Sequence, residues 1–149
     1  MVPGGPGVSL DDEVLLAWLR AAHRSTLLTA SVCTGALLLA RAGILAGVEA
    51  TTHWKSRDRL AALGAIVVTE RVVRRVVEGR VVITGAGVAS GIDLALHVAA
   101  ELSDAVTAEA IQLQLEYAPN PPFSSGDPAT ARRDVLERNS VLWPAPRRN

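Results

Sequence analysis

The sequence has few aromatic residues, one cysteine and one lysine. Phe, Trp and Tyr make up 3% of the 149 residues, so aliphatic side chains have to build the core. Cys33 is the only cysteine, which excludes an internal disulfide and fits a reducing compartment. Because only three histidines accompany it, we expect no metal site.

Net charge is also lacking, since 15 basic side chains balance 15 acidic ones. This balance argues against nucleic acid as a partner, because phosphate binding requires a basic surface. The longest uncharged run, residues 25–40, contains polar residues and falls short of the ~20 apolar residues of a membrane span. The N-terminus does not resemble a signal peptide. We therefore expect a cytoplasmic protein without membrane contact.

The remaining pattern alternates short apolar strands with amphipathic or apolar helices. Strands are predicted at 26–31, 50–52, 65–68, 71–77 and 80–84, and helices at 14–22, 35–46, 54–63, 90–103, 105–116 and 133–138. Glu78-Gly79 joins two valine-rich strands and predicts a hairpin. Such alternation indicates an α/β fold with a mostly parallel sheet covered on both faces.

The chain does not open as such a fold normally does. Only Met1 and Val2 precede the turn Pro3-Gly4-Gly5-Pro6-Gly7, where a first strand is expected. We therefore expect a partial fold, without the first strands and helix. It divides into a domain at 1–125 and a Pro- and Arg-rich C-terminal tail at 126–149.

The main candidate for chemistry is the run Ser31-Val32-Cys33-Thr34-Gly35, between a predicted buried strand and an apolar helix. Small residues around a central nucleophile are typical of a nucleophile elbow, a strained turn that exposes the central side chain. A helix N-terminus would favour the reactive thiolate form. The alternative is a buried structural cysteine, because free cysteines are among the most buried residues.

Two further groups of residues invite a functional interpretation. His53 follows a predicted strand at the same sheet edge as Cys33, so a Cys–His pair is possible. The alternative is a histidine hydrogen-bonded at a strand end, and we interpret His23 and His97 as structural or solvent-facing. Gly85, Gly87 and Gly91 are spaced one residue too widely for a dinucleotide motif. Tight packing explains them, and no cofactor is expected.

Three separated runs resemble one known family. SVCTGALLLARAGILAG, ATTHWKSRDRLAALGA and GRVVITGAGVASGIDLALHVAAEL are similar to the ThiJ/PfpI superfamily, the class I glutamine-amidotransferase-like proteins. Together with QLxxEYxPxPPF at 112–123, they look most like the isonitrile hydratase branch and the amidase-like domains fused to AraC-type regulators. The resemblance implies a flavodoxin-like three-layer sandwich, usually a homodimer.

The resemblance also implies a site and a reaction. Cys33 matches the nucleophile, and the backbone N–H groups of Thr34 and Gly5 match the oxyanion hole. Thr34 also supports the nucleophile, and His53 matches a histidine near the thiol. The implied reaction adds water to a small isonitrile to give an N-substituted formamide, without a cofactor. The alternatives are glyoxalase- or deglycase-like chemistry on small α-oxoaldehydes, and a non-catalytic cysteine-based sensor.

One family feature has no match in this sequence. Family members have an acidic residue near the end of the first strand, whereas Asp11, Asp12 and Glu13 lie on the helix after the glycine turn. The chain as written therefore resembles an N-terminally truncated member, and truncation would make it inactive. Losing acid–base help typically costs ~10²–10⁴-fold in rate. We further expect poor solubility, or an oligomer that covers the exposed strand.

Overall fold

A computed structural model describes residues 1–5 and 9–144, so Pro6 and Gly7 of the predicted turn lie outside the described residues. The chain forms two compact units, Met1–Leu115 and Glu116–Asn149. The first contains the candidate site, and the second contains one helix, α6 (Arg133–Leu142). The domain boundary expected at residue 125 stays a prediction.

The first unit is organised around a three-stranded sheet of order β1-β5-β4. Strand β1 (Leu28–Val32) runs parallel to β5 (Arg80–Gly85), and β4 (Val72–Val77) is antiparallel to β5. The predicted hairpin is therefore confirmed. On the other edge of β1, Val2 forms a parallel bridge with Ser31. Strands β2 (Glu49–Ala50) and β3 (Ile66–Val67) form a separate parallel pair.

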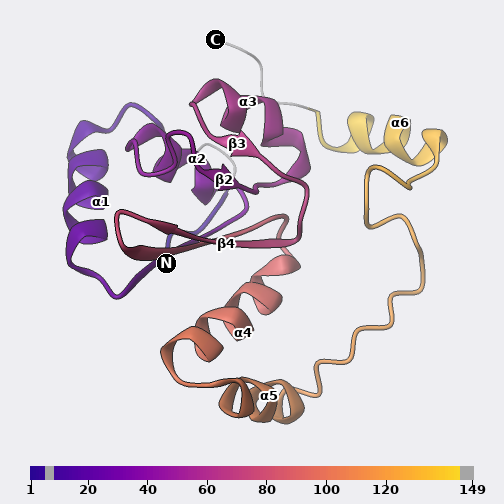
Figure 1. Cartoon of the computed structure of the whole chain (residues 1–149). Helices are drawn as coiled ribbons and strands as arrows, with labels where there is room; N and C mark the ends of the chain where they lie inside the picture. Colours follow the sequence, from indigo (N-terminus) through magenta and orange to yellow (C-terminus); the bar gives the residue numbers. More distant parts are fainter. Residues whose placement is uncertain (6–8, 145–149) are drawn as a thin grey trace. The chain divides into compact units, whose positions relative to one another are not determined.

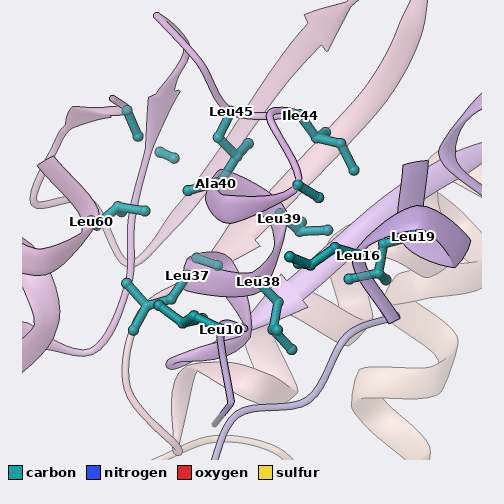
Figure 2. Packing of buried hydrophobic residues seen from close by; sticks show 14 of the residues in the cluster. Leu10, Leu16, Leu19, Leu37, Leu38, Leu39, Ala40, Ile44, Leu45 and Leu60 are labelled. Carbon is teal, nitrogen blue, oxygen red and sulfur yellow. The ribbon is translucent and has the colours of Figure 1, made fainter. Parts of the chain in front are cut away.

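Helices cover both faces of this sheet, as the three-layer prediction requires. Val82 belongs to one buried cluster and its neighbour Ile83 to another, and alternate strand residues point to opposite faces. The larger cluster joins Val82 to helices α1 (Glu13–Ser25) and α2 (Gly35–Arg41), and Figure 2 shows its leucine-rich packing. The smaller one joins Ile83 to α4 (Ser90–Leu102). In Figure 1, α2 and α4 accordingly lie on opposite sides of the hairpin.

The remaining helices of this unit follow the prediction with one correction. A 3-10 turn (Trp54–Ser56) leads into α3 (Arg57–Ala62), and α5 (Ala105–Gln114) follows α4. The helix predicted at 35–46 is wrong beyond Arg41. Gly43 has φ 83°, a left-handed conformation that glycine adopts without penalty, and the chain leaves the helix there.

The helices of the described residues are short or carry polar side chains. None of them combines the length and the apolar surface that a bilayer crossing needs.

Candidate active site

Cys33 occupies a strained turn between β1 and α2. Its φ of 57° lies in the left-handed region, which costs a residue with a Cβ about 1–2 kcal/mol. Two hydrogen bonds hold this backbone: the Cys33 N–H donates to the Gly85 carbonyl (3.0 Å), and Thr52 Oγ1 donates to the Cys33 carbonyl (2.8 Å). The side chain is half-buried. The strand-to-helix turn therefore has the geometry expected of a nucleophile elbow.

Glycine at position 4 lets the N-terminal loop approach this turn closely. A Cβ on Gly4 would lie 2.7 Å from both the Cys33 Cβ and the Thr34 amide nitrogen. Real Cβ atoms do not approach so closely, so any larger residue would displace the loop or the turn. The N-terminal loop is thus one wall of the candidate site.

Gly5 and Thr34, the two predicted oxyanion-hole residues, are in direct contact. The Gly5 N–H donates to Thr34 Oγ1 (2.9 Å), and Thr34 Oγ1 donates to the Gly5 carbonyl (3.0 Å). The Thr34 N–H has no acceptor among residues 1–5 and 9–144. One backbone donor beside Cys33 is therefore available to an anion, whereas the Gly5 N–H is shared with a hydroxyl.

His53 lies at the same sheet edge but is not joined to Cys33. Its Nδ1 accepts from the Lys55 N–H (3.3 Å), which leaves the proton of the neutral ring on Nε2. Burial, followed by the positive charges of Lys55 and Arg57, lowers the pKa of His53 below its ordinary 6.5. In the part of the chain that the structure describes, no hydrogen bond links this ring to Cys33. The arrangement therefore fits a neutral proton donor better than a partner that ionises the thiol.

Gly85, at the end of β5, and Gly87, just after it, both lie in close packing. A Cβ on Gly85 would lie 3.3 Å from the Leu94 Cβ, and one on Gly87 would lie 3.4 Å from the His53 Cδ2. Gly85 therefore allows α4 to pack closely on the sheet, and Gly87 places the loop after β5 against the histidine ring.

Sequence reasoning missed a set of buried hydroxyl groups below the turn. Thr84 Oγ1 accepts from the Thr51 N–H (3.0 Å), and Ser31 pairs in register with Thr84 on the adjacent strand. With Thr52, all these residues are fully buried or nearly so. The available signal was the Thr51-Thr52 pair directly before His53. The Thr84 hydroxyl thus holds the chain after β2 against β5, and the Thr52 hydroxyl holds it against the Cys33 turn. Ser31 Oγ and Thr51 Oγ1 have no hydrogen-bond partner among the described residues.

The other predicted residues lie away from Cys33. His23 on α1 is buried, with its Nδ1 2.8 Å from Thr29 Oγ1, and His97 on α4 is exposed. Asp12 caps α1 by accepting from the Leu15 N–H. In the described residues, no acidic side chain forms a hydrogen bond with Cys33 or Thr34.

The geometry and the family comparison agree. Residues 1–101 match the model of the DJ-1/PfpI family, and the chain belongs to that family. It is 49% identical over 138 residues to an isonitrile hydratase from Pseudomonas putida, a match that covers 91% of this chain and 59% of that protein. The chain thus spans less than two thirds of this relative's length.

Solved structures support the same assignment. A THiJ/PfpI family protein from Pseudomonas syringae is 43% identical with a TM-score of 0.81, and the match covers 89% of this chain and 53% of that one. An AraC family transcriptional regulator from Pseudomonas putida is 20% identical with a TM-score of 0.62, over 75% of this chain and 60% of that one. The second likeness concerns the fold alone. The expected flavodoxin-like α/β fold is therefore confirmed.

Proposed function

We propose that this chain is a cysteine-dependent, isonitrile hydratase-like enzyme. The proposal rests mainly on Cys33, held at φ 57° beside the unpaired Thr34 N–H, in a chain that is 49% identical to an isonitrile hydratase. We further propose that residues 1–125 act as the domain, as a cytoplasmic homodimer that uses no cofactor and no metal. The tail at 126–149 lies outside the reaction.

The proposed reaction begins with attack of the Cys33 thiolate on the terminal isonitrile carbon. A carbon–sulfur bond forms, and the carbon takes up one proton to give a thioimidate. Water then adds to this carbon, and the nitrogen takes up a proton. The new hydroxyl group loses its proton as the thiolate departs, which returns the proton taken up by the carbon and releases the N-substituted formamide. One isonitrile and one water are consumed for each product.

The residues around Cys33 have distinct roles in this scheme. The Thr34 N–H stabilises the oxygen that becomes negative when water adds, as an oxyanion-hole donor does. The Gly5 N–H becomes a second donor if Thr34 Oγ1 gives up its bond to it. His53, held neutral at physiological pH, donates a hydrogen bond from Nε2 and keeps its proton.

The test is direct product detection with matched variants. The protein is incubated with a simple alkyl isonitrile in ¹⁸O-water, and the N-alkylformamide is measured by mass spectrometry. We expect labelled formamide with the wild-type chain and none above background with Cys33→Ala. Equal formamide in both samples would contradict the proposal. Turnover of methylglyoxal in place of the isonitrile would instead favour glyoxalase-like chemistry.

A further inference from the structure

A cavity of about 170 Å³ lies at the end of the sheet opposite Cys33. Its walls come from α1, from the turn that follows α2, and from the turn between β4 and β5. We call it the α1 cavity, and its polar lining residues are Arg20, His23, Arg24 and Glu78. His23 contacts Thr29 near the start of β1, whereas Cys33 follows its end, so roughly 13 Å of strand separates the two sites.

His23 is the unusual member of this lining. Its side chain is 5% exposed, and its Nδ1 is 2.8 Å from Thr29 Oγ1. Its Nε2 is buried and has no hydrogen-bond partner among the described residues. Buried polar atoms are rarely left unpaired, because removing them from water is unfavourable. His23 therefore lines the cavity while its Nε2 lies beneath the surface, without a partner among the described residues.

Two arginines of α1 line the same cavity as His23. Arg20 and Arg24 are four residues apart and share one face of α1. Arg24 forms no ion pair within the described residues, and Arg20 makes only a long contact of 3.7 Å with Glu13. Two guanidinium groups thus line the cavity with one carboxylate, that of the exposed Glu78.

The neighbouring charges also act on the histidine itself. Burial is the main cause of the lowered pKa of His23, and the positive charges of Arg80 and Arg24 act in the same direction. The negative charge of Glu78 opposes them, and it is the largest of the charge effects on His23. An anion placed between these groups would stabilise the imidazolium and raise the pKa of His23, so anion binding and protonation should be coupled.

We propose that the α1 cavity binds a small oxyanion, a carboxylate or phosphate group, held by Arg20 and Arg24 beside the ring of His23. Two guanidinium groups match the geometry of such oxygens and repel a divalent cation. The volume admits a group of a few heavy atoms and no large ligand. This site is separate from Cys33 and does not depend on the proposed hydratase activity.

The experiment follows the histidine ring resonances by NMR while inorganic phosphate, or in a second series acetate, is added at constant ionic strength near pH 6.5. We expect the His23 signal to move and saturate, and its pKa to rise with ligand. His53 and His97 serve as internal references. If the His23 signal saturates with phosphate but not with acetate, the site is specific for a phosphate group. If it saturates with both anions, the site is a general oxyanion site. Linear drift of all three signals would overturn the proposal.

Three variants separate this site from general charge effects. Arg24→Gln should weaken binding about tenfold, the effect of one charge-assisted hydrogen bond. Arg59→Gln removes the same charge from an exposed position on α3 and should leave affinity unchanged. Glu78→Gln removes the opposing carboxylate and should tighten binding. Equal weakening by Arg24→Gln and Arg59→Gln, or no change with Glu78→Gln, would contradict the assignment.

Discussion

The hydroxyl of Thr34 and the backbone of Gly5 exchange two hydrogen bonds, of 2.9 and 3.0 Å. This exchange ties the loop before α1 to the turn that contains Cys33, although the two residues are 29 positions apart. A single side chain thus joins the candidate oxyanion donor to the candidate nucleophile.

Thr34→Val should therefore loosen the site as well as destabilise the fold. Valine keeps the shape of threonine but can neither accept from the Gly5 N–H nor donate to its carbonyl. At 0.5–1.5 kcal/mol for each bond, we expect a loss of about 1–3 kcal/mol in the free energy of unfolding. Urea denaturation measures this change. Thr34→Ser retains the hydroxyl and is the control, and equal losses in both variants would contradict the hydrogen-bond explanation.

Gly4 and Gly5 offer a matched pair of alanine substitutions. A Cβ at Gly4 would overlap Cys33 and Thr34, whereas one at Gly5 would have no described atom within 4 Å. Overpacking of this kind costs about 1–3 kcal/mol, so Gly4→Ala should be destabilised and Gly5→Ala nearly unaffected. The rate of Cys33 alkylation by iodoacetamide should change only in Gly4→Ala. Similar alkylation rates in both variants would show that the loop does not shape the turn.

Replacing Cys33 itself should give an inverted order of stability. Glycine normally lowers the stability of the fold relative to alanine by about 0.5–1 kcal/mol. At φ 57°, however, the left-handed conformation destabilises alanine by about 1–2 kcal/mol and glycine not at all. We therefore expect Cys33→Gly to be more stable than Cys33→Ala by about 0.5–1 kcal/mol, measured by urea unfolding. If alanine is the more stable of the two, the left-handed turn is not maintained in solution.

The stability of the fold should decrease in mild acid. The pKa of His53 is lowered by burial and by Lys55 and Arg57, and that of His23 chiefly by burial. As the pH falls through about 6.5, the unfolded chain takes up these protons before the folded one, so the free energy of unfolding decreases from pH 7.5 to 5. Unfolding at several pH values should show a shallower slope in His53→Gln. His97→Gln, at an exposed position, is the control, and equal slopes in both would contradict this assignment.

Leu94 is the fully buried apolar side chain of helix α4. Leu94 is fully buried against Ala30 and Ile83, so Leu94→Ala should cost about 2–5 kcal/mol. Leu113 on α5 is 82% exposed, and Leu113→Ala should change stability little. Thermal or urea unfolding compares the two, and a small effect at Leu94 would show that α4 does not depend on this contact.

The sequence pattern was informative wherever the chain has a local signal. The valine-rich runs around Glu78-Gly79 define the hairpin, and small residues around Cys33 define the turn, because both depend on neighbours in the chain. Gly43 marked the true end of α2, but the apolar residues that follow it continued the helical pattern. The glycine and the apolar spacing are both compatible with the local sequence. The periodicity alone does not show which of the two determines where the helix ends in the folded protein.

Contacts between distant segments were beyond the reach of such patterns. Nothing near Thr52 indicates that its hydroxyl donates to the Cys33 carbonyl, or near Gly5 that its N–H is shared with Thr34. The same holds for the α1 cavity, whose walls come from three separate parts of the chain. Sheet order and register determine these contacts, and neither of them follows from composition or spacing.

The mixed pairing of β5 has a consequence for the order in which the chain assembles. Its antiparallel partner β4 is two residues away and can pair as soon as both are made, whereas its parallel partner β1 lies roughly fifty positions earlier. The Gly85 carbonyl that holds the Cys33 amide arrives only with this second pairing. During synthesis the thiol therefore emerges early but acquires its constrained geometry late. The Cys33 turn is thus a marker of finished folding, and a half-made chain does not yet hold Cys33 in this conformation.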